Sequence, residues 1–179
     1  EIIGRGGTSG IGVFSFDFGG FIVDGGHSLK SKSSFLPSSA SQAKPPQLLA
    51  HYDFPDDWEI LLVILDSKNT VNGQKEVNIF QDYCPVPKNE VEQTSHIIFM
   101  NMIPFLLERD LPAFGHSIDE IQKRGFKNVE VSLQSQQIRD LMDKLREIGA
   151  YGVGMSSFGP TVYSVFDKNN KHIVEEIKE

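Results

Sequence analysis

The sequence has little cysteine, little positive charge and no long hydrophobic run. Its one cysteine, Cys84, excludes an intramolecular disulfide and, without a second thiol, does not predict a metal site. No apolar stretch approaches the roughly 18 residues that a membrane-spanning helix requires. The chain contains 17 Lys and Arg but 24 Asp and Glu, and the resulting net charge of −7 argues against nucleic-acid or membrane-surface binding. The single cysteine fits a reducing interior and predicts a cytoplasmic protein.

What is present suffices for a folded core. Hydrophobic residues make up 39% of the 179 positions, and 13 residues are Phe, so disorder of the whole chain is not expected. At about 150 residues per domain, the length predicts one domain or slightly more. The chain starts with Glu1 and enters a glycine-rich loop without a signal-like region. We therefore expect it to be a portion of a longer protein.

The strongest functional signal is the segment GRGGTSGIG at residues 4–12, with glycine at five of nine positions. Apolar residues at 11–18 have helical spacing, with Thr8 or Ser9 as the expected N-cap. Backbone N–H groups of such a loop, next to a helix N-terminus, bind phosphate, and an arginine and two hydroxyls add donors. The predicted phosphate-binding residues are Gly4, Arg5, Gly6, Gly7, Thr8, Ser9, Gly10 and Gly12.

Other interpretations of this loop are weaker. It is not a Walker motif, because no Gly-Lys-Ser/Thr follows, and not a dinucleotide fingerprint, because no strand precedes it in this chain. A flexible loop near a terminus is the remaining alternative.

Further along, Asp24 and His27 flank two glycines, and a carboxylate that orients an imidazole makes a general base. A polar turn is the alternative there. Residues 152–160 are expected to form a third segment, a glycine-containing loop whose small residues allow close packing or the approach of a ligand.

Helices and strands are expected to mix without strict alternation, which favours an α+β fold over a doubly wound sheet. The apolar, β-branched run at residues 58–66 predicts a buried strand. Ser117-x-x-Glu120 predicts a helix start, and residues 28–46, with seven serines and three prolines, predict a mobile linker. The other expected elements are a helix at 89–110 broken by Pro104, strands at 129–133 and 161–166, a helix that follows Ser135 and stops at Gly149, and a helix at 173–178.

The glycine segments at 4–12 and 19–27 closely resemble the archaeal beta-ribofuranosylaminobenzene 5'-phosphate synthases. These belong to the GHMP superfamily, named for galactokinase, homoserine, mevalonate and phosphomevalonate kinases. Residues 58–66, 73–80 and 152–162 also look similar, so the resemblance covers nearly the whole chain. The segment 154–159 resembles the third motif of the superfamily. On that basis the substrate-side residues are Gly154, Ser156, Ser157 and Gly159.

The resemblance implies a two-lobed fold of the α+β class. Residues 1–50 would be the remainder of the N-terminal lobe, with the phosphate loop and the linker, and residues 51–179 a ferredoxin-like C-terminal lobe. It implies a decarboxylating transfer from phosphoribosyl pyrophosphate to 4-aminobenzoate or 4-hydroxybenzoate, with release of CO2 and pyrophosphate, in methanopterin biosynthesis. It also implies Mg2+, with ligands that the resemblance does not identify, and a homodimer. Asp24 and His27 would be the catalytic residues.

Two other functions remain open at this point. The first is a GHMP-type kinase that binds ATP with the same loop. Ser9-Gly10-Ile11-Gly12 departs from the Gly-Leu-x-Ser-Ser core that is more usual in those kinases. The second is a phosphate-binding portion without turnover, since the chain begins after the superfamily's first motif and stops before the family's usual end.

Overall fold

The computed structural model describes residues 6–28, 30, 34–66, 71, 73–170, 172, 175 and 176. The chain divides into two compact units. One consists of Glu1–Phe54 and Asn72–Pro85, and the other of Pro55–Val71 and Val86–Glu179. Both units mix helices with irregular segments and strands, so the predicted α+β class is confirmed. The assignment of residues 1–50 and 51–179 to two lobes stays a prediction.

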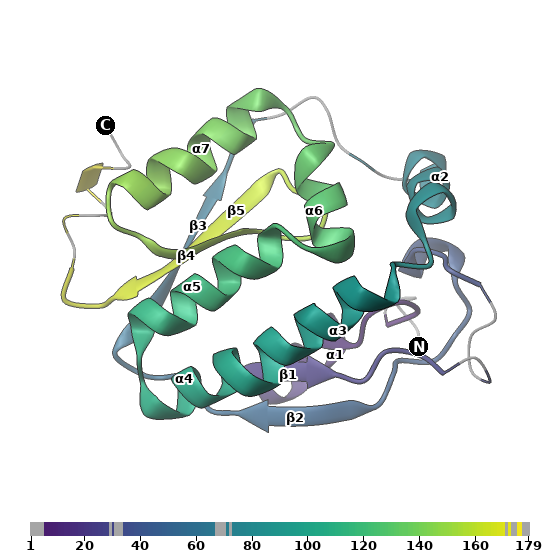
Figure 1. Ribbon diagram of the computed structural model, residues 1–179, viewed down its shortest axis with the longest axis horizontal. Helices are drawn as coiled ribbons and strands as arrows, with labels where there is room; N and C mark the ends of the chain where they lie inside the picture. The colour runs from purple at the N-terminus through teal and green to yellow at the C-terminus, as the bar shows by residue number, and fades with distance from the viewer. Residues whose placement is uncertain are drawn as a thin grey trace. The chain divides into compact units, whose positions relative to one another are not determined.

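The first unit contains a short helix and a two-stranded sheet (Figure 1). Helix α1 (Ile11–Phe18) follows the glycine loop as predicted and ends at Gly19, whose φ of +68° suits a residue without Cβ. Strands β1 (Phe21–Asp24) and β2 (Leu48–Tyr52) pair antiparallel. The short 3-10 helix η1 (Ser38–Ala40) and helix α2 (Gly73–Tyr83) complete the unit.

The second unit is built on a three-stranded antiparallel sheet in the order β3-β5-β4. Its strands are β3 (Trp58–Ile64), β4 (Tyr151–Met155) and β5 (Thr161–Asp167). β3 forms one edge of the sheet; its inner face packs against the core, and on its outer face Trp58 is buried against Phe114. The outer face is 54–69% exposed at Ile60, Leu62 and Ile64, so the predicted burial of this strand is wrong on that face. A short apolar run does not distinguish a central strand from an edge strand.

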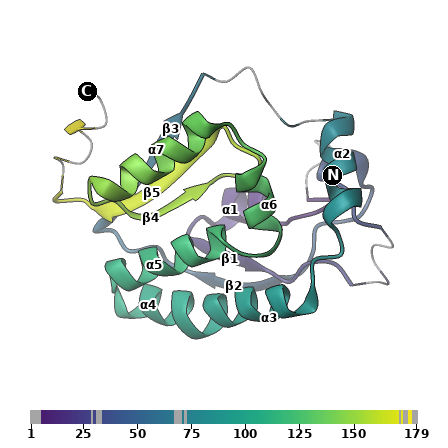
Figure 2. The same ribbon diagram turned by 45° about the horizontal axis from the view of Figure 1, so that its top comes forward.

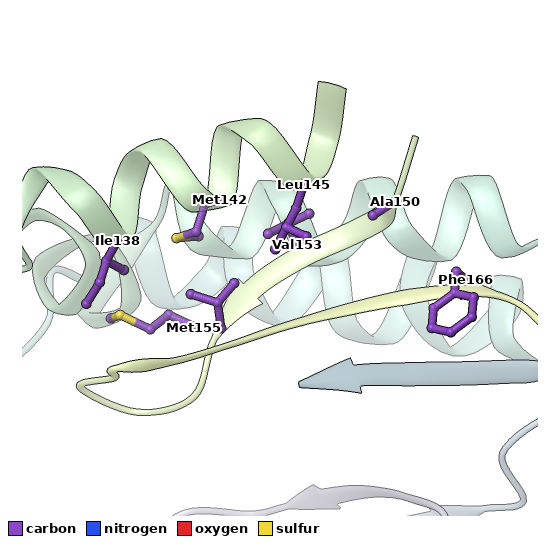
Figure 3. Packing of buried hydrophobic residues seen from close by; sticks show 8 residues of the cluster. Ile138, Met142, Leu145, Ala150, Val153, Met155 and Phe166 are labelled. Atoms are coloured by element: carbon purple, nitrogen blue, oxygen red, sulfur yellow. The ribbon is translucent and has the colours of Figure 1, made fainter. Parts of the chain in front are cut away.

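The hydrophobic core of this unit lies between the sheet and α7 (Gln136–Glu147) (Figure 3). The start of α7 after Ser135 and its stop at Gly149, where φ is +89°, agree with the prediction. Helix α5 (Leu111–Gln122) lies on the other side of the sheet from α7 (Figure 2). The buried side chains of the core are Ile138, Met142, Leu145, Ala150, Val153, Met155, Val162 and Phe166.

The helix expected at residues 89–110 is interrupted, as Pro104 suggested. It consists of α3 (Lys88–His96), a π-helical segment η2 (Ile97–Met102) and α4 (Ile103–Glu108). Pro104 lies in the first turn of α4, where a missing backbone N–H is tolerated. The segments η2 and α4 run along α5, which lies between them and the sheet, and α3 reaches α6 (Gly125–Ser132) (Figure 2).

Two predictions for this region are wrong. Helix α5 begins after Asp110, whose carboxylate accepts the N–H of Ala113 at 3.1 Å, and not at Ser117. Ser117 is buried in the middle of the helix and donates its hydroxyl to the Ala113 carbonyl at 3.0 Å. Residues 129–133 were expected to form a strand because of their valines, but they belong mostly to helix α6 (Gly125–Ser132). Its Val131 packs against the core, and tertiary packing outweighs the weak strand preference of valine.

The helix expected at 173–178 lies largely outside the described residues. Within the described ranges, no helix has both the length and the apolar character that crossing a membrane requires.

Candidate functional site

The predicted phosphate loop presents the N-terminus of α1. Gly10 is the N-cap residue, and its carbonyl accepts the N–H groups of Val13 at 3.0 Å and Phe14 at 2.9 Å. The expected N-cap, Thr8 or Ser9, is therefore one or two positions too early. Ser9 still takes part, because its Oγ accepts the N–H of Ile11 at 3.3 Å. The partial positive charge of this helix end favours an anion.

Asp24, at the end of β1, connects the loop to the second glycine segment. Its Oδ2 accepts the hydroxyl of Ser9 at 2.9 Å and the N–H of Gly10 at 2.8 Å. Its Oδ1 accepts the N–H of Gly26 at 3.0 Å. The structure thus brings together three of the residues that the sequence singled out, and it does so through hydrogen bonds to a carboxylate.

His27 does not pair with Asp24. Its Nε2 lies 2.7 Å from the carbonyl oxygen of Lys44. A carbonyl can only accept a hydrogen bond, so Nε2 carries the proton, and in the neutral ring Nδ1 holds the lone pair. The expected aspartate–imidazole arrangement is therefore wrong, because the Asp24 oxygens serve backbone and hydroxyl donors and the His27 ring is oriented by a carbonyl.

Residues 36–46, named the strap here, pack against the loop. A Cβ on Gly6, where φ is +90°, would lie 2.6 Å from Cγ of Pro45, and a Cβ on Gly7 would lie 2.9 Å from Cβ of Ser41. The hydroxyl of Thr8 donates to the carbonyl of Leu36. The segment has little regular structure, as predicted, but it makes specific contacts and is not a mere linker. At Gly6 and Gly7, glycine is needed because the strap approaches the backbone closely.

The other predicted loop residues differ in their surroundings. Gly4 and Arg5 lie outside the described residues. Gly12 is exposed in the first turn of α1, and a Cβ there would meet nothing within 4 Å. Gly12 is thus the one glycine of the described loop at which open space, and not a protein neighbour, faces the backbone.

The third predicted segment, residues 152–160, is half strand and half turn. Gly152 and Gly154 belong to β4, which corrects the expectation of a continuous loop. A Cβ on Gly154 would collide with the phenol ring of Tyr163, so packing accounts for this glycine. The remaining turn closes with two backbone bonds of 2.9 Å, from Ser156 N–H to Thr161 and from Gly159 N–H to Ser156. Ser156 and Ser157 are exposed, and Ser157 has a φ of +49°.

Two polar side chains hold this turn from α6 and the residues after it. Lys127 donates from Nζ to the carbonyls of Met155 at 3.2 Å and Ser157 at 3.4 Å, and it pairs with the carboxylate of Glu130. Gln134 donates from its side-chain amide to the carbonyl of Phe158. Lys127 and Gln134 could not be recognised from the sequence, since nothing in their local pattern connects them to a turn about 25 to 30 positions later.

Charges near the same turn act on Tyr163. Burial of the phenol, and after it the negative charges of Asp119 and Glu130, raise the pKa of Tyr163 to about 12. The hydroxyl therefore stays protonated at neutral pH. Across the described part of the chain, no three His, Cys, Asp or Glu side chains gather to hold a metal ion. The loop with Asp24 belongs to the first unit and the Ser156–Ser157 turn to the second.

Known proteins resemble the chain over its whole length. It is 54% identical to the beta-ribofuranosylphenol 5'-phosphate synthase of Methanothermobacter thermautotrophicus over 179 residues, which are all of this chain and 54% of that relative. The same-named proteins of Archaeoglobus fulgidus and Methanocaldococcus jannaschii are each 49% identical, over 100% and 98% of this chain and 55% and 53% of the relative. The chain thus spans about half the length of the curated relatives it matches.

A family model agrees with the resemblance drawn from the glycine motifs. Residues 102–179 match the C-terminal family of the GHMP kinases. That region contains α4, α5, α6, α7, β4 and β5. Residues 102–179 therefore match the GHMP kinase C-terminal family, and the chain as a whole corresponds to a portion of the beta-ribofuranosylphenol 5'-phosphate synthases.

Proposed function

We propose that this chain is part of a pentosyltransferase of methanopterin biosynthesis that acts in the cytoplasm. The reaction would join the ribosyl phosphate of phosphoribosyl pyrophosphate to 4-hydroxybenzoate, with release of CO2 and pyrophosphate. The observation that carries the proposal is the 54% identity along the full chain to a synthase of that kind. The relatives are named for a ribofuranosylphenol, and a phenol is what 4-hydroxybenzoate becomes after losing CO2. This favours 4-hydroxybenzoate over 4-aminobenzoate as the acceptor.

The reaction balances without an oxidant. The ring carbon that carries the carboxylate forms a bond to C1 of the ribose, while the bond from C1 to the pyrophosphate oxygen breaks. The carboxyl group then leaves as CO2 and its bonding pair returns to the ring. Pyrophosphate gains negative charge as it departs, so donors aimed at it lower the barrier.

The loop is the part of the chain best suited to that task. Arg5 and the backbone of residues 6–8 and 12 would hold the phosphates, at the positive end of α1. His27 would act as the base for the phenolic hydroxyl through Nδ1, because Nε2 already donates to Lys44. The turn with Ser156, Ser157 and Gly159 would face the substrate. Gly154 would support that turn through its contact with Tyr163.

The proposal includes Mg2+ and a homodimer, as the resemblance implies. Mg2+ usually binds through one or two carboxylates together with substrate phosphates. Among the described residues no three possible ligands gather, and Asp24 uses its oxygens for Ser9, Gly10 and Gly26, so the structure assigns no ligand to the metal. No catalytic step is therefore derived through the metal.

A GHMP-type kinase is the second candidate function, because the matching family at residues 102–179 is named for kinases. The two enzymes release different products. If the protein is the transferase, its incubation with phosphoribosyl pyrophosphate and 4-hydroxybenzoate should yield CO2 and pyrophosphate in equal amounts. Release of ADP from ATP in the presence of a small alcohol would instead support the kinase. A protein that binds pyrophosphate and turns over neither pair would be the inactive phosphate-binding portion.

The role of Arg5 is tested in the intact protein. Arg5→Ala should raise the KM for phosphoribosyl pyrophosphate at least tenfold, about 1.4 kcal/mol, because a bidentate phosphate contact is lost. The charge-matched control is Lys88→Ala, which removes a cation from an exposed ion pair of α3 with Glu92. An unchanged KM in Arg5→Ala would contradict the role of this residue in phosphate binding.

A further inference from the structure

Asp24 lies where the chain turns away from its sheet. The pairing of β1 with β2 shifts between Val23 and Asp24, and the next residue, Gly25, donates its N–H to the carbonyl of Gln47 at 2.8 Å. Asp24 itself is only partly exposed. This irregular strand end places the carboxylate between two glycine turns that are about 15 residues apart in the chain.

Three donors converge on the carboxylate. Oδ2 accepts from the hydroxyl of Ser9 and the N–H of Gly10, and Oδ1 accepts from the N–H of Gly26, at 2.8 to 3.0 Å. Hydrogen bonds to an ionised acceptor are stronger than those between neutral groups. Because the Ser9 proton is directed to Asp24, the Ser9 oxygen is free to accept the N–H of Ile11 at 3.3 Å. The carboxylate therefore orients the start of α1 through Ser9 as well as through Gly10.

We infer that Asp24 is a positioning residue and not a proton carrier: it fixes residues 9–11 of the loop against the Gly26 turn. A general base needs an oxygen within hydrogen-bond reach of the substrate proton. A carboxylate has about four acceptor directions, and three are used here. The inference rests on the proposed function for its catalytic consequence, and on the hydrogen bonds alone for its structural one.

The residues of the loop have different tasks. The Ser9 hydroxyl and the Gly10 N–H are already bound to a negative group, so they support the loop instead of contacting a phosphate. Gly12, in contrast, faces open space in the first turn of α1, which suits the approach of an anion.

The first test is amide hydrogen exchange in Asp24→Asn. The asparagine side chain keeps one oxygen and replaces the other by an N–H2 group, which cannot accept from a backbone N–H. Exchange at Gly10 or Gly26, or at both, should rise at least tenfold. Asp17→Asn, an equal change of charge at an exposed position of α1, should leave both amides unchanged. Unchanged exchange in Asp24→Asn would overturn the inference, whatever the protein catalyses.

A second variant covers the case in which Asp24→Asn does not fold. Ser9→Ala removes one of the three donors and leaves both backbone N–H groups in place. Exchange should then rise at Ile11, whose acceptor is the Ser9 oxygen, while Gly26 stays protected. If Gly26 also lost protection in Ser9→Ala, the carboxylate would not be held independently by the loop and by the Gly26 turn. That result would contradict the inference.

Kinetics of the intact protein separate positioning from proton transfer. Asp24→Asn should raise the KM for phosphoribosyl pyrophosphate at least tenfold and change kcat less than threefold, because the loop binds the substrate and Asp24 orients the loop. A hundredfold fall in kcat at constant KM would show proton transfer and overturn the inference. Tighter binding of inorganic pyrophosphate would overturn it as well, since Asp24 would then be a competing anion. If the unaltered protein neither binds pyrophosphate nor consumes the substrate, the proposed function fails, and hydrogen exchange alone decides the role of Asp24.

Discussion

Gly115 of α5 and Gly152 of β4 approach so closely that a Cβ on Gly115 would lie 2.7 Å from the backbone nitrogen of Gly152. The contact is mutual, because a Cβ on Gly152 would lie 2.8 Å from Cα of Gly115. Gly152 also has a φ of +58°, which disfavours other residues. This pair of glycines sets the distance between the helix and the strand.

Gly115→Ala should therefore destabilise the second unit. The added methyl group meets backbone atoms that cannot rotate away, so the free energy of unfolding should fall by about 1–3 kcal/mol. Urea denaturation followed by circular dichroism measures the change. Gly12→Ala serves as the control, because its methyl group enters open space in a helix and should stabilise by up to about 1 kcal/mol. Equal effects of the two substitutions would contradict the close contact.

Lys127→Met should loosen the turn with Ser156 and Ser157. It removes the two hydrogen bonds to Met155 and Ser157 and leaves the buried carboxylate of Glu130 without its cation. Lys127 is itself partly exposed, so the expected loss of stability is about 2 kcal/mol, less than for a fully buried pair. Urea denaturation of Lys127→Met, Glu130→Gln and the double variant gives the coupling. The double variant should be more stable than the sum of the single changes predicts, and simple additivity would refute the pairing.

The hydroxyl of Tyr163 should lose its proton at a higher pH than that of an ordinary tyrosine. Its pKa of about 12 in the folded protein lies above the ordinary value of 10, because burial and the nearby charges of Asp119 and Glu130 disfavour the phenolate. The stabilising effect of the protonated phenol is complete below pH 10 and is lost as the pH rises from 10 towards 12. Absorbance at high pH should show a step near pH 12 that Tyr163→Phe lacks and Tyr83→Phe retains. The same step in Tyr163→Phe would assign it to another residue.

Local patterns were enough for several elements. Helix α1 after the glycine loop, strand β5 and helix α7 were all predicted. Each has an apolar pattern, and each of the two helices also has a glycine or a serine at a boundary. The start of α5 was not, because Ser117 and Glu120 imitate a capping box, whereas the helix already begins after Asp110. At α6 the two valines favoured a strand, but the segment is helical because Val131 packs against the core from a helix.

The site shows a similar division between local and distant contacts. Composition identified the glycine loop, and Asp24 lay within a motif that the sequence made visible. The partners of Asp24 and His27 did not follow, since a general base is only one of several uses for such a pair. The strap was recognised as irregular, but no local rule says that Pro45 packs against Gly6 or Ser41 against Gly7. These contacts depend on the fold of the first unit.

The side chains of α5 also bind backbone groups along the outer edge of β4. Asp119 accepts the N–H of Val153 at 3.2 Å, and Gln122 accepts the N–H of Met155 at 3.0 Å. Arg146 donates to the Val153 carbonyl at 3.2 Å from α7. Side chains thus occupy the positions that the backbone of a neighbouring strand would otherwise fill. Unpaired strand edges are the usual starting points of aggregation, and at β4 two helices protect the sheet from recruiting a strand of another molecule.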